Sequence, residues 1–306
     1  MEIIEYSRGM RRGEPCVIAL GFFDGVHLGH RDLLLAARRE ADALGISFGI
    51  FTFKSSGKIK SGTKRIYTDE LKAQIFAELS ADFAVFAEFS ELSGLSAEEF
   101  VCEVLISDLG ARVAVAGYNY RFGKGALADA DTLSELMKKS GGEAIIRDEF
   151  KLDGKTVSTT VIREALERGD VKLAGKLLGA PYKALGIVSH GRGEGRRLGF
   201  PTLNTHPHKL ALLPKNGVYK TSVRIAGKTY AALTNVGICP TFDAREAHME
   251  TYLLGYSGDI YGKDIAINFL DYIREEKQFA SEKELILQIN VDINTALSKE
   301  KLELEN

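Results

Sequence analysis

Through the first half of the chain, apolar runs that predict buried strands alternate with amphipathic stretches that predict helices. The strands are expected at residues 16–21, 46–53, 83–89 and 111–117, and the helices at 28–44 and 68–79. A further helix is expected after Ser96 and Glu99, which have the spacing of a capping box. Strands of near-continuous apolar residues are typical of parallel sheets covered on both faces. The pattern therefore predicts an α/β domain with a doubly wound, Rossmann-like parallel sheet.

Phe83, Phe86 and Phe89 all fall in one of these apolar runs. They are expected to belong to the core of the sheet rather than to a ligand platform.

The pattern changes after two short helices expected near residues 159–178. Short strands and glycine-rich turns follow, which predicts an antiparallel β-barrel. A final stretch with Ser281 and Glu284 in capping-box spacing predicts one amphipathic helix on the barrel. Its apolar face is expected to contain Leu285, Ile289, Ile293 and Leu297. We therefore expect two domains, residues 1–182 and 183–306.

Composition and charge narrow the class of protein. The 306 residues are 45% hydrophobic and 27% charged, as in ordinary globular domains, and the net charge is −2. This balance gives no reason to expect a nucleic-acid or membrane partner. The scattered Cys16, Cys102 and Cys239 are expected to be reduced thiols, and without a signal-like apolar start the chain is expected in the cytoplasm.

The stretch GFFDGVHLGH, residues 21–30, follows the first predicted strand and opens the first predicted helix. A strand, a glycine turn and a helix N-terminus direct backbone N–H groups towards an anion. His27 and His30 are three residues apart, so both imidazoles are expected to face that anion and to neutralise a phosphate. Close backbone approach is the expected reason for Gly21, Gly25 and Gly29. The alternative is an ordinary turn with surface histidines.

The stretch HGRGEGRRLGFPTLN, residues 190–204, concentrates glycines and basic side chains. Backbone amides of such a loop are able to hold phosphate oxygens. It lacks the Gly-Lys-Ser/Thr of a P-loop, and no helix is expected to follow it. The alternative is a basic surface loop. His206 and His208 are expected to be solvent-exposed, because no third metal ligand accompanies them.

Several stretches together resemble one family along most of the chain. GFFDGVHLGH is similar to the HxGH signature of nucleotidylyltransferases, in the version found in the prokaryotic bifunctional riboflavin kinase/FAD synthetase family. In the same order, GYNYRFGK (117–124), VSTTVIR (157–163) and LLGAPY (177–182) resemble later motifs of its first domain. PTLN (201–204) and HMETYLLGY (248–256) resemble motifs of its kinase domain.

The resemblance implies that the N-terminal domain transfers the adenylyl group of ATP to FMN, giving FAD and pyrophosphate. It implies that the residues that hold ATP phosphates there are Gly21, Phe23, Gly25, His27, Gly29, His30, Ser158, Thr159, Thr160 and Arg163. Arg163 is implied as a guanidinium fork on phosphate, with a solvated helix charge as the alternative. Asn119 and Phe122 are implied as flavin contacts.

For the barrel, the resemblance implies phosphorylation of riboflavin by ATP. Glu250 is implied as the catalytic base, and Thr202 and Asn204 as ligands of Mg²⁺. The phosphate loop is implied to contain Gly191, Gly193, Gly195, Gly199 and Pro201. Arg274 is implied near the flavin, with an ion pair to Glu275 or Glu276 as the alternative.

One departure from the family leaves a second interpretation open. The family usually has Thr-Phe-x-Pro-His-Pro after its second strand, whereas this chain has Thr52-Phe53-Lys54-Ser55-Ser56. Either Lys54 or Lys58 replaces the missing ring as a point charge, or the protein is a riboflavin kinase whose first domain has weak or lost adenylyltransferase activity. A flavin-binding regulator of nucleic acid is a third interpretation, which the net charge disfavours. The oligomeric state is not predicted.

Overall fold

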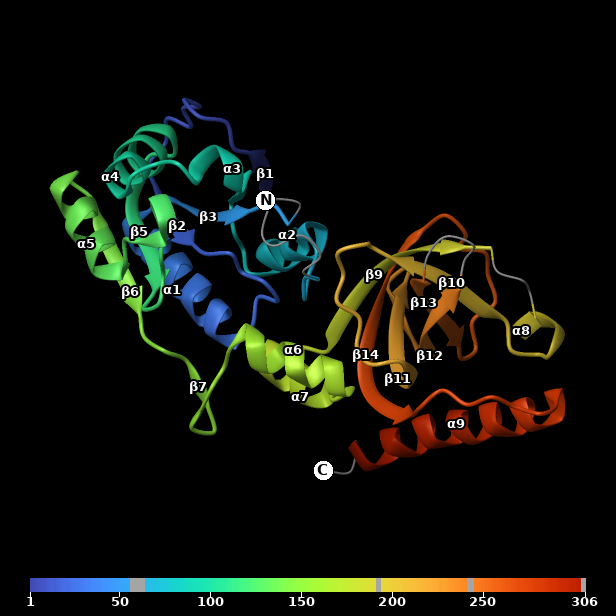
Figure 1. The fold of residues 1–306 in the computed structure, drawn as a ribbon. Coiled ribbons are helices and arrows are strands. Elements are labelled where there is room, and N and C mark those ends of the chain that lie inside the picture. The colour runs from blue at the N-terminus through green and yellow to red at the C-terminus, as the bar shows by residue number, and fades with distance from the viewer. Residues whose placement is uncertain (56–63, 191–193, 241–244, 304–306) are drawn as a thin grey trace. The chain divides into compact units, whose positions relative to one another are not determined.

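The computed structural model describes residues 1–55, 64–190, 194–240 and 245–303 and forms two compact units, Met1–Thr159 and Thr160–Asn306 (Figure 1). The first unit is a parallel α/β sheet, and the second contains a closed antiparallel barrel with a C-terminal helix. The predicted fold class is therefore confirmed. The domain boundary at residue 182 stays a prediction.

Unit 1 has a parallel sheet with the strand order β1-β4-β3-β2-β5-β6. Its strands are β1 (Glu2–Glu5), β2 (Cys16–Leu20), β3 (Ser47–Phe53), β4 (Phe83–Ala87), β5 (Ala111–Gly117) and β6 (Glu143–Arg147). The order reverses between β2 and β5, and in open α/β sheets ligands bind in the crevice at such a reversal. The loops that follow β2 and β5 are therefore the ones that flank the crevice.

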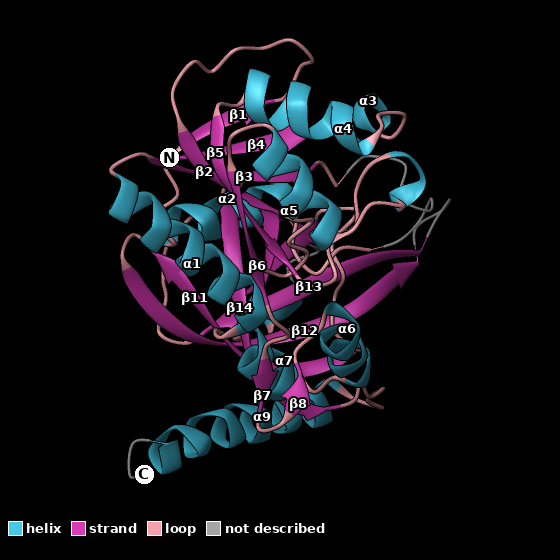
Figure 2. Cartoon of the chain, turned by 90° about the vertical axis from the view of Figure 1, so that its left-hand side faces the viewer, coloured by secondary structure: helices cyan, strands magenta, loops and turns pink. Residues whose placement is uncertain are grey.

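Helices and short elements connect these strands (Figure 2, helices cyan and strands magenta). They are α1 (Leu28–Leu44), α2 (Asp69–Glu78), α3 (Phe89–Leu92), α4 (Ala97–Glu99), the π-helix η1 (Phe100–Asp108), the 3₁₀ turn η2 (Lys124–Ala126), α5 (Ala130–Lys139), β7 (Lys151–Leu152) and β8 (Lys155–Thr156). The predicted capping box is present, since Ser96 Oγ accepts from Glu99 N at 3.1 Å and Glu99 Oε2 accepts from Ser96 N at 2.7 Å.

Of Phe83, Phe86 and Phe89, which were all predicted to lie in the core, only the first two are buried. Phe83 and Phe86 are buried in β4, as predicted. Phe89 begins α3 and is 40% exposed, so its assignment to the core is wrong. The reason is that β4 ends at Ala87, two residues before the apolar run ends.

Unit 2 contains α6 (Thr159–Arg168), whose first residue belongs to unit 1, and α7 (Val171–Leu178), which packs against the barrel strands β9 and β14. The closed barrel has the order β10-β13-β12-β11-β14-β9, with every pairing antiparallel. Its elements are β9 (Tyr182–Ser189), α8 (Glu194–Arg197), β10 (Thr202–Pro207), β11 (Gly217–Ile225), β12 (Lys228–Pro240), β13 (Arg245–Leu253) and β14 (Asp264–Arg274).

Side chains alternate between the inside and the outside of the barrel, because successive residues of a strand point to opposite faces. Thr221, Thr234 and Thr251 are fully buried, and their hydroxyls form a chain with steps of 2.8 and 2.9 Å. Side chains of the barrel's own strands thus fill this part of its interior.

The C-terminal helix α9 (Glu282–Glu303) covers part of the outer face. Ser281 Oγ accepts from Glu284 N at 3.3 Å, which confirms the predicted cap, and the Glu284 carboxylate accepts from Ala280 N. Ile293 packs on Val218 and Leu233 of the barrel. Leu297 is 42% exposed, so its place on the buried face is wrong.

Within the described residues, no helix is long and apolar enough to span a membrane. Cys16, which is buried, and Cys102, which is exposed, are free thiols.

Candidate active sites

The predicted HxGH motif lies at the carboxyl end of β2. His27 is the N-cap of α1, and its Nδ1 accepts from His30 N at 3.3 Å. The two imidazoles stack with centroids 3.6 Å apart and planes 15° apart. The sequence prediction that both rings occupy the same space at the helix N-terminus is consistent with this geometry.

Both histidines are uncharged at neutral pH. Burial lowers the pKa of His27 to about 4. Burial, followed by the neighbouring His27 and Lys72, holds the pKa of His30 well below its usual range. His30 Nδ1 is buried and has no hydrogen-bond partner among the described residues. Neutral imidazoles can act as hydrogen-bond donors, whereas the sequence prediction was that they would neutralise a phosphate by their charge.

The residues around the pair explain the glycines of the motif. A Cβ on Gly21 would lie 2.8 Å from the ring of Phe23, which is buried. A Cβ on Gly29 would lie 3.3 Å from the ring of His27. Gly25 has φ +83°, which favours glycine in the turn. Packing of the loop's own rings is thus a second reason for these glycines, and their approach to phosphate stays a prediction.

The segment after β3, where this chain differs from the family, holds Lys54 in two ion pairs. Lys54 Nζ lies 3.2 Å from Glu5 Oε1 and 3.6 Å from Glu88 Oε1, so two carboxylates already engage it. Its role as a replacement charge stays a prediction, and Ser56 and Lys58 lie outside the described residues. Ser55 instead donates its hydroxyl to Asp69 at 2.7 Å.

Lys72, which the sequence prediction missed, lies buried beside this segment. Its ammonium pairs with Asp69 at 2.9 Å and donates to Phe53 O at 3.1 Å. It also lies 5.0 Å from the ring centroid of Phe22, within cation–π range. A lysine among the apolar positions of α2 was the available signal, because lysines are rarely buried unless paired.

An aromatic cavity of ≈ 290 Å³ lies in the same unit. Its rings come from β3, α3, η1 and the loop after β5, and they are Phe53, Phe89, Phe100, Tyr120 and Phe122. Tyr120 and Phe122 stack with centroids 5.6 Å apart. The predicted flavin contact Phe122 is thus part of the wall of this cavity, and its role stays a prediction. Asn119 Oδ1 lies 3.4 Å from a Cβ built on Gly117, at the start of the same loop.

The predicted phosphate contacts of the Ser/Thr motif fall at the unit boundary. Ser158 precedes α6, Thr159 begins it, and Thr160 is exposed on it. Arg163 is half-buried on the same helix. Their predicted position at the triphosphate stays a prediction.

The predicted kinase residues meet on the outer face of the barrel. The antiparallel register places Thr202 opposite Tyr252, and Asn204 opposite Glu250. Opposite residues share a face of the sheet, so Thr202, Asn204 and Glu250 project outward together. The side chain of Glu250 is 43% exposed, which agrees with an outward position on the strand.

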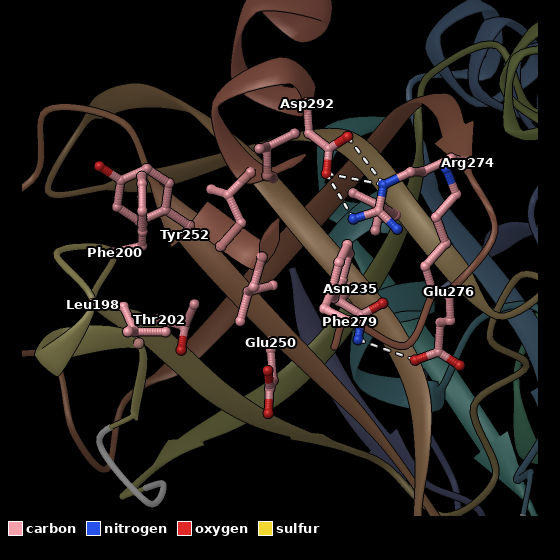
Figure 3. Close-up of a pocket in the computed structure, with 16 residues that line it drawn as sticks. Leu198, Phe200, Thr202, Asn235, Glu250, Tyr252, Arg274, Glu276, Phe279 and Asp292 are labelled. Atoms are coloured by element: carbon pink, nitrogen blue, oxygen red, sulfur yellow. Dashed lines mark hydrogen bonds and ion pairs between the residues drawn. The ribbon is translucent and has the colours of Figure 1, made fainter. Parts of the chain in front are cut away.

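Beside them is a cavity of ≈ 320 Å³ (Figure 3). Its polar groups include Thr202, Asn235, Glu250 and Arg274, and its apolar wall includes Leu198, Phe200, Val218, Leu233, Phe279, Leu285 and Ile289. Asn235 Nδ2 donates to Glu276 at 3.1 Å, whereas its Oδ1 is buried without a partner among the described residues. That oxygen is available to accept from a ligand hydroxyl.

Arg274 pairs across the cavity with α9. Its Nε and Nη2 donate to Asp292 at 2.8 to 3.0 Å, and its Nη1 donates to Glu275 O at 2.9 Å (Figure 3). The alternative of a surface ion pair with the Glu275 or Glu276 carboxylate is therefore wrong. Only 15% of the Arg274 side chain and 4% of the Asp292 side chain are exposed. This ion pair fixes α9 over the cavity.

The predicted phosphate loop lies next to a second cavity of ≈ 560 Å³, which shares Thr202 with the first. Pro201 lines it, together with Arg196 and Asp259. Gly195 is in the short helix α8, which lies inside the glycine-rich stretch, and the stretch leads into the strand β10 rather than into a helix, as predicted. Gly199 has φ +88°.

The remaining loop glycines, Gly191 and Gly193, lie outside the described residues. His206 and His208, on and just after β10, are exposed, as predicted.

The donor set suits magnesium better than a softer metal. Thr202 offers a hydroxyl, Asn204 an amide carbonyl and Glu250 a carboxylate, all hard oxygens on one face. Across the described residues, no group of three or more His, Cys, Asp or Glu side chains is positioned to hold a metal. Mg²⁺ commonly uses few protein ligands together with substrate phosphates, so the residues present fit it.

Comparisons with known proteins agree with the division into two different domains. Residues 10–161 match the family model of FAD synthetase, and residues 178–299 match that of riboflavin kinase. The bifunctional riboflavin kinase/FMN adenylyltransferase of Bacillus subtilis is 33% identical, covering 92% of this chain and 91% of its own. The protein of that name from Listeria monocytogenes is 34% identical, covering 90% of each. This chain belongs to that family. The presence of both domains supports the bifunctional interpretation over a kinase alone.

A solved structure shares the fold of the whole chain. The crystal structure described as a macrolide-efflux protein from Streptococcus pneumoniae superimposes with a TM-score of 0.87 at 30% identity, covering 97% of this chain and 99% of its own. The efflux description applies to that protein. For the present chain, the two family models and the curated relatives agree on flavin chemistry.

Proposed function

We propose that the barrel phosphorylates riboflavin to FMN with ATP, and that unit 1 adenylylates FMN to FAD. The observation that carries the proposal is the outer face of the barrel. There, a carboxylate, two hard oxygen donors and an apolar cavity lie together.

In the kinase reaction, the flavin ring system occupies the cavity beneath α9, where Arg274 holds the helix in place. The ribityl chain extends towards Glu250, and the Asn235 Oδ1 that lacks a partner accepts from one of its hydroxyls. Glu250 takes the proton of the terminal hydroxyl as that oxygen attacks the γ-phosphate. ATP occupies the neighbouring cavity, with its phosphates against Pro201.

The magnesium ligands are Thr202 and Asn204, which lie beside Glu250 on β10. When bound, Mg²⁺ supplies neutralisation of the phosphate charge. Thr202 lines both cavities and so stands where the flavin and nucleotide sites meet.

In the adenylyltransferase reaction, the aromatic cavity holds the flavin of FMN against Phe122. Asn119, earlier in the same loop, is a second flavin contact. His27 and His30 donate to phosphate oxygens at the N-terminus of α1, where the helix dipole also favours negative charge. Arg163, with the hydroxyls of Ser158, Thr159 and Thr160, holds the triphosphate from α6. Catalysis here is positioning and charge stabilisation.

We also propose that the protein works in the cytoplasm and has no nucleic-acid partner. Failure to bind heparin at moderate salt is expected for a chain with net charge −2.

The test is a chromatographic time course of the whole protein with riboflavin, excess ATP and Mg²⁺. We expect FMN first and FAD later. His27→Ala is expected to stop at FMN, and Glu250→Gln is expected to form no FMN from riboflavin while still converting supplied FMN to FAD. If wild-type protein never makes FAD, even from supplied FMN, the adenylyltransferase proposal fails and the kinase alone remains.

A further inference from the structure

The side chain of His248 lies next to that of Glu250, the proposed catalytic base. His248 and Glu250 are two residues apart on β13, so both project from the outer face of the barrel. His248 Nε2 lies 3.8 Å from Glu250 Oε1. His248 is not among the residues that line the flavin cavity, so it reaches the reaction only through Glu250.

The neighbouring strand β12 leaves room for the imidazole ring of His248. His248 is opposite Gly237 of β12, and a Cβ there would lie 3.0 Å from His248 Cε1. The same Cβ would lie 2.7 Å from Glu276 Oε1, the oxygen that accepts from Asn235. The absence of a side chain at Gly237 therefore makes the room that the imidazole ring and the Glu276 carboxylate share.

The surroundings of the His248 ring favour one of its two neutral tautomers. His248 Nδ1 is buried and has no hydrogen-bond partner among the described residues. A neutral imidazole has one nitrogen that donates and one that accepts. A buried donor without an acceptor is costly, and a carboxylate beside Nε2 attracts an N–H. The arrangement thus favours the tautomer with hydrogen on Nε2, directed at Glu250 Oε1.

We propose that His248 is a positioning residue of the kinase reaction, donating from Nε2 to Glu250 Oε1 so that Oε2 faces the attacking hydroxyl. The proposal rests on the role of Glu250 proposed above. The separation of 3.8 Å shortens when substrate arrives, since catalytic hydrogen bonds are often long without ligand.

The proton balance of the step is simple. The ribityl oxygen forms its bond to the γ-phosphorus while the bond from that phosphorus to the bridging oxygen of ADP breaks. The hydroxyl proton passes to Glu250 Oε2. His248 keeps its own proton on Nε2 throughout, and so orients the base without exchanging with the substrate.

Two substitutions at one position separate donation from packing. His248→Leu fills the space but cannot donate, whereas the amide of His248→Gln can still donate to Glu250. Because a hydrogen bond to a charged group has a large effect, we expect His248→Leu to lower the kcat of FMN formation about tenfold or more. The KM values for riboflavin and ATP should stay unchanged, and His248→Gln should restore most of the kcat.

A double variant tests whether His248 acts through Glu250. In the Glu250→Gln background, His248→Leu should cause no further loss, because the carboxylate that it orients is gone. His206→Leu, at an exposed position on β10, is the matched control and should keep the wild-type kcat.

The outcomes distinguish the two proposals. Full activity of Glu250→Gln overturns the role of Glu250, and this inference with it. Loss of activity in Glu250→Gln, with an unchanged kcat in His248→Leu, overturns this inference alone. So does an equal loss in His248→Leu and His248→Gln, because packing then explains the effect.

Discussion

Lowering the pH from 7 to 5 should destabilise unit 1 through His27. Its pKa is about 4 in the folded chain, because it is buried, against 6.5 for an ordinary histidine. As the pH falls below 6.5, the unfolded chain gains a proton that the folded chain cannot accept until the pH nears 4. The stability contributed by this group is therefore present above pH 6.5 and lost between these two values.

The magnitude follows from the two pKa values. At pH 5, proton binding favours the unfolded chain by a factor of roughly 30, which corresponds to ~2 kcal/mol at this one site. A loss of this size is a large share of the stability of a typical domain. His30, whose pKa is shifted the same way, adds to the loss.

His27→Asn isolates the contribution of His27. Asparagine keeps a side-chain oxygen for the N-cap of α1 but does not titrate. Hydrogen exchange resolved to peptides of β2 and β5 would measure unfolding of unit 1 separately from the barrel. Between pH 7 and 5, the variant should lose ~2 kcal/mol less than the wild-type protein. His206→Asn, at an exposed position, should behave as wild type. An equal loss in His27→Asn and wild type would refute the reasoning.

Three further substitutions have separable outcomes. Asp292→Leu leaves the buried Arg274 unpaired, which should cost about 3–5 kcal/mol of barrel stability in urea unfolding and raise the KM for riboflavin; unchanged values would contradict the role of this pair. Gly49→Ala places a Cβ 2.0 Å from the Phe83 ring and should cost unit 1 about 1–3 kcal/mol by hydrogen exchange, while kinase activity at 25 °C is retained. Phe122→Leu should raise the KM for FMN in adenylylation about two- to tenfold without changing the KM for riboflavin phosphorylation; equal effects on both would argue against the aromatic cavity.

Sequence patterns predicted the regular elements well where burial is uniform. The helix at 28–44 and the strand at 111–117 have the bounds expected from their apolar patterns. The strand Glu2–Glu5 was missed because it is short, has charged ends and pairs only with β4 at the sheet edge. Such a strand depends on its tertiary neighbour rather than on its own pattern.

The sequence motifs predicted the candidate site residues. The residues that pair with them from other elements were harder to predict. The pairing of Arg274 with Asp292 joins a strand to a helix, and nothing local in the sequence specifies it. The proximity of Lys72 to His30 likewise depends on how α2 packs. His248 is different, because its spacing of two from Glu250 on an expected strand already places both on one face.

Alternate residues of β13 point to opposite faces of the barrel wall. Met249, Thr251 and Leu253 are buried in the barrel, whereas Glu250 and Tyr252 between them line the cavity next to α9. The residues of the inward set can be substituted while those of the outward set are kept, and the reverse also holds. Deleting a single residue from β13 would affect both sets at once, because a shift of one position would turn Glu250 towards the barrel interior and a core side chain towards the cavity. The register of β13 therefore matters for the barrel core and for the cavity together.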